Sequence, residues 1–243
     1  MVGPCDVLAV GAHPDDVELG CGGLLARLVG QGRLVGILDF TAGELATRGD
    51  AELRHREAAA AAKALGVAWR SCLALPDGGL DPTAAAQRSS VVHALRAATP
   101  RVVLLPHLED PHPDHAAAAE LLRAAAFLAG VARWGSDLGP PSRPGLLLAY
   151  PGPRQVLLTG VIVDVGASYA GKLAALAAHR SQFDPAAGPR THLASGHFLA
   201  GVEGRDRAAG NLIGCEFAEG FEAVGPLDAD ALVWLLAKEE RCA

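Results

Sequence analysis

Short apolar runs alternate with longer amphipathic stretches along most of the chain, and this alternation predicts its secondary structure. Strands are indicated over residues 6–11, 33–40, 67–75, 101–106, 145–150 and 160–165, the first of them buried. Helices are indicated over residues 19–30, 52–65, 82–98, 114–128 and 172–179, with Gly66 ending the second of them. Strands that alternate with helices of this length are typical of βαβ units, so we expect a mostly parallel sheet covered on both faces.

No repeat and no segment of linker composition interrupts these elements, which favours one α/β domain over residues 1–243. We expect the first five strands to lie in the order 3-2-1-4-5, the order of a doubly wound sheet. Residues 135–144 are rich in Gly and Pro and are predicted to form a loop, which we consider a candidate lid.

Two short polar motifs follow predicted strands. Ala12-His13-Pro14-Asp15-Asp16 comes directly after the first strand, and His112-Pro113-Asp114-His115 lies between the fourth strand and the next helix. Ligands of open α/β sheets bind beyond the carboxyl ends of the strands, at the point where the strand order reverses. In the expected order the first and fourth strands flank that point, so the two motifs should face each other across one crevice.

The residue types in these motifs are those of a hydrolytic metal centre. Catalytic zinc commonly has three protein ligands and an open position for water. His13 and Asp16 lie close enough in sequence to bind one ion, and His115 supplies a third ligand from the facing loop. The same donor set also accepts Fe²⁺, Co²⁺ or Mn²⁺.

The remaining polar residues of the motifs suggest how an amide could be hydrolysed there. Asp15 is the candidate general base for the attacking water. His112 is the candidate group for stabilising the oxyanion or protonating the leaving amine. Asp114 is the candidate for accepting a hydrogen bond from the free N–H of a liganding imidazole, which fixes its tautomer. Carboxylates are also common at helix N-termini without any metal. Two such motifs past two strands favour the metal interpretation.

Composition excludes several other classes of protein. The net charge is −6 and no block of Lys and Arg occurs, which argues against nucleic acid and anionic membranes as partners. Five scattered cysteines (Cys5, Cys21, Cys72, Cys215 and Cys242) form no CxxC pair, so neither a disulfide framework nor a thiolate zinc site is predicted. With no basic, apolar leader and no apolar run of membrane-spanning length, we expect a soluble cytoplasmic protein.

Gly20, Gly22 and Gly23 resemble part of a dinucleotide site, but the GxGxxG pattern fails because Leu25 occupies its last position. These glycines are expected to let the first helix approach the sheet closely.

At these motifs the chain resembles the PIG-L/LmbE-type family of zinc-dependent N-acetylglucosaminide deacetylases. The resemblance continues through Thr41-Ala42-Gly43-Glu44, Thr47-Arg48-Gly49 and Arg54, and later through Ser181-Gln182-Phe183 and residues 217–221. It implies a Rossmann-like three-layer sandwich with one zinc ion on His13, Asp16 and His115, Asp15 as base and His112 as electrostatic partner. It also implies a homo-oligomer, a hexamer or a trimer.

The fuller set of residues is most similar to the branch of bacillithiol biosynthesis, whose substrate is N-acetyl-α-D-glucosaminyl L-malate. Relatives in that branch commonly carry Arg before the HPDH motif, where this chain has Pro111. Glu44, Arg48, Arg54 and Arg207 are candidate substrate-binding residues, since an arginine can bind a carboxylate with two hydrogen bonds. Solvated surface positions are the competing interpretation for the arginines, and helix-end packing is the expected role of Ser181-Gln182-Phe183.

Two alternatives remain open at this point. The same metal centre could serve an amidase of another glucosaminide or thiol conjugate, which the Pro111 replacement favours. The chain could also be a non-catalytic metal- or nucleotide-binding α/β module. His192 and His197 could line the pocket, although surface positions are expected for both.

Overall fold

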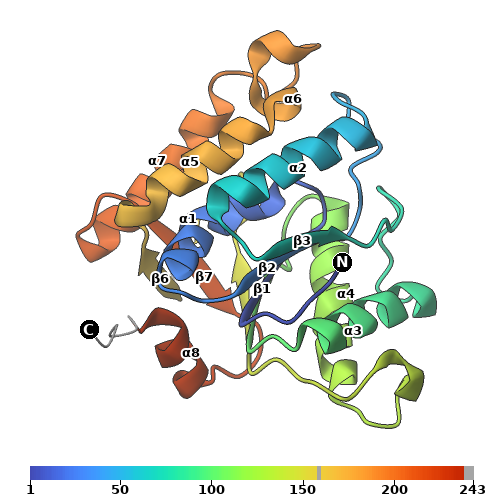
Figure 1. Ribbon diagram of the computed structural model, residues 1–243. Helices are drawn as coiled ribbons and strands as arrows, with labels where there is room; N and C mark the ends of the chain where they lie inside the picture. Colours follow the sequence, from blue (N-terminus) through green and yellow to red (C-terminus); the bar gives the residue numbers. More distant parts are fainter. Residues whose placement is uncertain (158–159, 238–243) are drawn as a thin grey trace.

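The computed structural model of the chain describes residues 1–157 and 160–237. Its centre is one sheet of seven strands, ordered β3-β2-β1-β4-β5-β7-β6 (Figure 1). The strands are β1 (Val7–Gly11), β2 (Val35–Asp39), β3 (Trp69–Cys72), β4 (Val102–Pro106), β5 (Leu146–Tyr150), β6 (Val161–Asp164) and β7 (Ala218–Ala223). Strands β1 to β5 pair in parallel, whereas β7 is antiparallel to both β5 and β6. The expected 3-2-1-4-5 order is confirmed.

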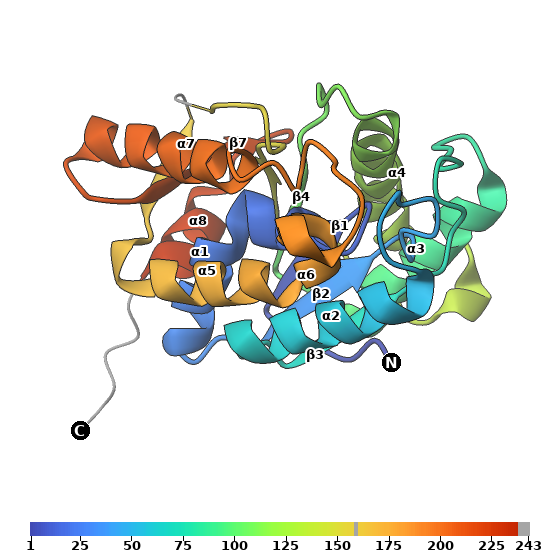
Figure 2. The ribbon, with the colours of Figure 1, turned by 90° about the horizontal axis from the view of Figure 1, so that it is seen from above.

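Helices cover both faces of this sheet, as the alternating pattern predicted. They are α1 (Asp16–Gly30), α2 (Ala51–Leu65), α3 (Ala85–Ala98), α4 (Pro113–Ala129), α5 (Tyr169–Ala178), α6 (Arg180–Phe183), α7 (Phe198–Ile213) and α8 (Ala229–Leu236). Helices α1, α2 and α5 pack together on one face, with α2 and α5 side by side in Figure 2. Helices α3 and α4 pack together on the other face (Figure 1).

Alternation along the strands supplies the two apolar layers. In β1, Val7 and Ala9 belong to the layer beneath α1, whereas Leu8 and Val10 belong to the layer beneath α3 and α4. Every residue of β1 is buried, as expected for a central parallel strand with helices on both faces.

The glycines of α1 allow the close packing that their sequence positions suggested. A Cβ atom at Gly20 would overlap the ring of Tyr150 on β5, and one at Gly23 would lie 2.9 Å from the Val165 side chain. Tyr150 in turn donates a hydrogen bond from its hydroxyl to the carbonyl of Val10, at 2.7 Å. Helix α1 is thereby fixed against the strand that precedes it.

Helix α1 is interrupted at Cys21, whose φ and ψ of −144° and 16° are not helical. The carboxylate of Glu219, on β7, accepts hydrogen bonds from the backbone N–H groups of Gly23 and Leu24, at 2.9 and 2.7 Å. It therefore caps the second part of the helix from inside the protein. The buried ammonium of Lys172 lies 2.7 Å from the same carboxylate and balances its charge.

The prediction that residues 135–144 form a lid is wrong. This segment joins the end of α4 to the start of β5, so it lies at the amino edge of the parallel strands. Arg96 of α3 is buried beneath it and donates hydrogen bonds to the backbone carbonyls of residues 129, 131, 134, 135 and 139. A segment anchored in this way cannot cover the opposite edge, where the polar motifs lie.

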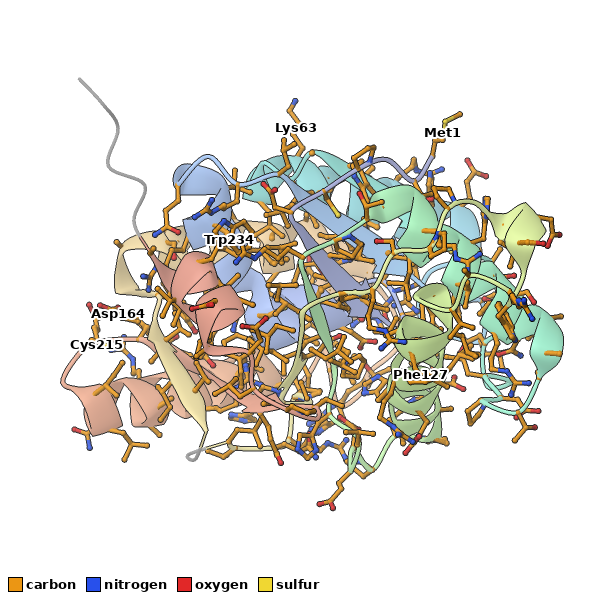
Figure 3. The ribbon with its side chains drawn as sticks, turned by 90° about the horizontal axis from the view of Figure 1, so that it is seen from below. Met1, Lys63, Phe127, Asp164, Cys215 and Trp234 are labelled. Carbon is orange, nitrogen blue, oxygen red and sulfur yellow. The ribbon has the colours of Figure 1, made fainter. Side chains whose placement is uncertain are left out.

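Helix α8 also packs at the amino edge of the sheet, where Figure 3 labels its Trp234. The guanidinium carbons of Arg33 and Arg101 lie 4.2 and 4.6 Å from the Trp234 ring. These arginines precede β2 and β4, so the contact holds the helix against the strand starts. Cys242 lies outside the described residues. Among the described helices, none is both long and apolar enough to cross a membrane.

Candidate active site

The two His-Pro-Asp motifs meet at the carboxyl ends of β1 and β4, which are parallel neighbours. The first motif occupies the turn between the end of β1 and the start of α1 at Asp16. The second lies between the end of β4 and the start of α4 at Pro113. The structure therefore brings the two motifs together at the predicted crevice.

The carboxylate of Asp15 lines the crevice and does not cap the helix that follows it. Asp15 precedes the first turn of α1 but makes no capping hydrogen bond with its side chain. Its φ of 120° lies in a region that residues with a Cβ rarely adopt, and such strain is concentrated at functional sites. His112 instead caps α4, because its Nδ1 accepts a hydrogen bond from the backbone N–H of Asp114 at 3.2 Å.

Asp16 contacts both histidines of the predicted ligand set. Its Oδ2 lies 3.6 Å from Nδ1 of His13, and its Oδ1 lies 3.1 Å from Nε2 of His115. The backbone N–H of His13 also donates to Oδ2, at 2.8 Å, and this bond orients the carboxylate. All three side chains are buried. The structure thus places one carboxylate between two imidazoles that come from opposite sides of the crevice.

The outward nitrogen of His13 faces two further carboxylates. Its Nε2 lies 3.0 Å from Oδ1 of Asp77 and 3.2 Å from Oδ2 of Asp114. A histidine that ligates a metal commonly donates its other N–H to a carboxylate, which fixes the tautomer. Asp114 is placed as predicted for that role. Asp77 was not predicted, although it follows β3 at the same edge of the sheet.

A second unpredicted carboxylate lies behind His115. Oδ2 of Asp110 is 3.2 Å from Nδ1 of His115, while its Oδ1 accepts a hydrogen bond from the backbone N–H of His112 at 2.8 Å. Asp110 therefore orients one ring and the loop that carries another. Its position two residues before His112, in the loop after a buried strand, was the available sequence signal.

The charge of this cluster fits a bound cation. Burial alone lowers the pKa of His13, but its bonds to Asp114, Asp16 and Asp77 raise it to about 12. Burial likewise opposes protonation of His115, yet Asp16 and Asp110 raise its pKa to about 10. The carboxylates thus stabilise positive charge at this position, which a divalent ion bound to oxygen and imidazole donors would supply.

Among the described residues, two groups of donors lie close enough together to hold an ion. Nitrogens of His13, His112 and His115 lie within 4.8 Å of one another, as do donor atoms of His13, Asp77 and Asp114. Asp16 belongs to neither group, although its carboxylate contacts both His13 and His115.

Asp15 has the environment of a carboxylate that can exchange a proton near neutral pH. Burial raises its pKa to about 6, against the opposing charge of Arg54. Nη2 of Arg54 lies 3.4 Å from Oδ2 of Asp15 and donates to the carbonyl of Pro14 at 2.6 Å. Arg54 thereby fixes the strained turn that presents Asp15.

His112 lies at the exposed side of the cluster. Its ring stacks on that of His115, with centroids 4.5 Å apart. Partial loss of water lowers the pKa of His112, and the positive charges of His115 and His13 lower it further. A neutral imidazole at the mouth of the site can donate a hydrogen bond to an oxyanion.

A pocket of about 540 Å³ opens above these residues. Its polar lining comprises His13, Asp15, Asp16, Arg54, Asp77, Asp110, His112, Asp114, His115, Arg154 and Gln182. Apolar side chains, among them Leu19, Leu193 and Phe198, form the rest of its wall, together with Pro111 and Pro153. A volume of this size is sufficient for a sugar conjugate.

The candidate substrate-binding residues are not all placed at this pocket. Arg54 lines it, whereas Glu44, Arg48 and Arg207 do not. Glu44 accepts from the backbone N–H of Asp77, and Arg48 is buried and donates to the carbonyl of Asp184.

Arg207 lies on the exposed side of α7. Its guanidinium pairs with Glu203 and Glu216 at 2.9 and 3.2 Å, and Arg207 does not line the pocket at the two His-Pro-Asp motifs. His192 and His197 are exposed and also lie outside the pocket lining, as expected.

The Ser181-Gln182-Phe183 segment packs a helix end, as expected. The Ser181 hydroxyl donates to Glu57 at 2.6 Å, and Phe183 stacks on Phe198 with centroids 5.8 Å apart. Gln182 additionally reaches the pocket.

Comparison with known proteins places this site in a family context. Residues 8–126 match the family described as PIG-L, GlcNAc-PI de-N-acetylase. The chain is 32% identical over 189 residues to the diacetylchitobiose deacetylase of Thermococcus kodakarensis. This match covers 73% of this chain and 70% of that protein. It is 48% identical over 60 residues to the uncharacterized deacetylase YaiS of Escherichia coli K12, spanning 25% of this chain and only 32% of that protein.

A solved structure extends the likeness to nearly the whole chain. The conserved protein TT1542 from Thermus thermophilus superposes with a TM-score of 0.81 at 40% sequence identity. The superposition covers 92% of this chain and 95% of that one.

Proposed function

Since this chain belongs to the PIG-L family, we propose that it hydrolyses the N-acetyl group of an acetylated glucosaminide at a metal ion on His13, Asp16 and His115. The observation that carries the proposal is the carboxylate of Asp16, whose two oxygens face His13 and His115 at 3.6 and 3.1 Å. A single carboxylate and two imidazoles form a hydrolytic donor set.

We assign zinc as the metal, one ion per chain. When bound, zinc would lower the pKa of a water molecule to roughly 7 and polarise the scissile carbonyl. The donor set is equally compatible with Fe²⁺, Co²⁺ or Mn²⁺.

The protein's own residues account for the proton transfers. Asp15, with a pKa of about 6, accepts the proton of the attacking water and holds it for the leaving amine. His112 donates a hydrogen bond to the oxygen of the former carbonyl as its negative charge develops. Asp114 and Asp110 keep the rings of His13 and His115 in orientation throughout.

As the specific substrate we propose N-acetyl-α-D-glucosaminyl L-malate. The diacetylchitobiose deacetylase among the relatives supports an acetylated sugar as the reacting part. The malate part rests on the wider sequence similarity to the bacillithiol branch. Another acetylated glucosaminide or thiol conjugate is the second candidate, because Pro111 lines the pocket where that branch commonly has an arginine.

A panel of acetylated glucosaminides tests the proposal. The zinc-loaded protein should release acetate from the malate glycoside faster than from N,N′-diacetylchitobiose or a thiol conjugate. Turnover of another member alone would transfer the assignment to that conjugate. Zinc binding without any acetate release would favour a non-catalytic metal-binding module.

A further inference from the structure

Arg154 is a pocket residue that the reaction described above does not use. Two arginines line the pocket, and they differ in their partners. Arg54 is buried, with its guanidinium bonded to the carbonyls of Gly43 and Pro14 at 3.1 and 2.6 Å. Arg154 is exposed, and no acceptor within residues 1–157 and 160–237 bonds to or pairs with its guanidinium. Its charge is therefore available to a ligand.

The backbone presents Arg154 at the tip of a tied turn. The N–H of Gln155 donates to the carbonyl of Gly152 at 3.0 Å, so Pro153 and Arg154 occupy the two central positions. Proline at the first central position restricts the turn. The Gln155 side chain accepts from the N–H of Gly152 at 2.9 Å and donates to the carbonyl of Glu109 at 3.0 Å. The turn is thus bound to the loop that carries the second metal motif.

The charges of the pocket explain why the unpaired guanidinium of Arg154 would affect which substrates bind. Five carboxylates line the pocket, on Asp15, Asp16, Asp77, Asp110 and Asp114. These carboxylates would repel an anionic group of a substrate that lies too far from the metal ion to be attracted by it. They would not repel a neutral sugar. A guanidinium offers a planar pair of donors that matches a carboxylate or a phosphate.

We infer that Arg154 determines specificity by binding an anionic group, a carboxylate or a phosphate, on the part of the substrate that projects from the metal centre. The inference rests on the proposed deacetylation. It adds a residue that selects the substituent on the sugar, apart from the residues that cleave the amide. Arg154 touches the substrate but takes no part in the proton transfers.

The test compares three substrates across matched variants. The malate glycoside carries carboxylates, N-acetylglucosamine 1-phosphate carries a phosphate, and methyl N-acetylglucosaminide is neutral. The variants are Arg154→Gln, Arg154→Lys and the control Arg133→Gln. Arg133 is also exposed, has no hydrogen-bond or ion-pair partner among the described residues, and lies after α4 at the other edge of the sheet.

Arg154→Gln should lower kcat/KM for at least one anionic substrate by about tenfold, mainly through KM, as expected for loss of a charged hydrogen bond. The neutral substrate should change by less than about twofold, and Arg154→Lys should retain more activity than Arg154→Gln. Arg133→Gln should leave all three unchanged. The affected anion identifies the carboxylate or the phosphate as the ligand.

Equal losses on the neutral and anionic substrates, or no loss on either, would overturn the inference. So would a wild-type protein that hydrolyses only the neutral substrate. If none of the three is hydrolysed, the proposed function fails on these substrates, and binding of L-malate to the zinc-loaded protein decides the inference separately. A Kd about tenfold weaker for Arg154→Gln than for wild type would support it, and equal values or no binding would overturn it.

Discussion

Oδ1 of Asp16 lies 3.1 Å from Nε2 of His115, although the two residues begin different helices after different strands. The same carboxylate is held through its other oxygen by the backbone N–H of His13, at 2.8 Å. The alignment of β1 with β4 therefore sets the distance between these two side chains. The site is assembled by the sheet, and no single loop contains it.

Replacing Asp15 with asparagine should separate metal binding from catalysis. The Asp15→Asn side chain keeps the size of Asp15 but cannot accept the proton of the attacking water. Turnover should fall by about 10²–10⁴-fold, the usual contribution of a general base. Zinc content, measured on the same preparation by elemental analysis, should remain one per chain. Unchanged turnover would remove Asp15 from the role of base.

Replacing Asp110 with asparagine should weaken metal binding, although Asp110 is not a ligand. Asp110 lies 3.2 Å from the outward nitrogen of His115 and fixes that ring. Loss of such a partner costs about 10–100-fold in metal affinity. Competition with a zinc chelator measures this effect. The adjacent, exposed Glu109 provides the control, because Glu109→Gln removes one carboxylate without touching a ligand. Similar affinities for the two variants would contradict this role.

A methyl group at Gly152 should displace the side chain of Asp110. A Cβ there would overlap Oδ2 of Asp110, so either the turn of Arg154 or the carboxylate must move. We expect Gly152→Ala to lower both zinc affinity and turnover. Gly201, on α7, has no atom within 4 Å of an added Cβ. Gly201→Ala should leave activity intact and gain about 1 kcal/mol in stability from helix propensity. Full activity in Gly152→Ala would show that the contact is not needed.

The buried pair of His179 and Glu18 should make stability depend on pH. Nε2 of His179 lies 3.3 Å from Oε1 of Glu18, which Arg70 also contacts. Burial lowers the pKa of His179, but the charge of Glu18 raises it above the ordinary value of 6.5, and Asp15 adds to the increase while Arg70 opposes it. The stabilisation is therefore complete below the unfolded pKa and is lost as the pH rises through the folded pKa.

Urea unfolding of wild type and His179→Gln measures this contribution. The difference in free energy of unfolding should be largest below about pH 6.5, the ordinary pKa of histidine, and shrink as the pH rises above it. A difference that stays the same across this range would assign His179 a packing role without a charge.

The sequence predicted the parts of the fold that follow simple periodicity. The first four strands and helices were located because β1, β2 and β4 are mainly apolar and each helix repeats apolar residues. Strand β3 was located although it contains Arg70 and is only half-buried. Helix α7 and strand β7 were not identified as elements. Three glycines and several charges break the apolar pattern of α7, and β7 contains Glu219, which is buried only because it caps α1 and pairs with Lys172.

The site shows a similar division. The meeting of His13, Asp16 and His115 could be predicted because two motifs follow two strands that the topology makes neighbours, whereas their role as metal ligands stays a prediction. Asp77 and Asp110 were missed because each is a single carboxylate in a loop. Its role depends on which ring nitrogen it faces in the folded protein. The lid prediction failed because nothing in the sequence reveals that Arg96 binds the last carbonyl of α4 and four carbonyls of the loop that follows.

The most direct test of the account is acetate release from N-acetyl-α-D-glucosaminyl L-malate while metal-free protein is titrated with zinc. Activity should rise with added zinc and reach its maximum at one ion per chain, and Asp16→Asn should show almost none at the same zinc concentration. Absence of acetate at every zinc concentration, or equal activity in Asp16→Asn, would contradict the assignment of a metal-dependent deacetylase centred on Asp16.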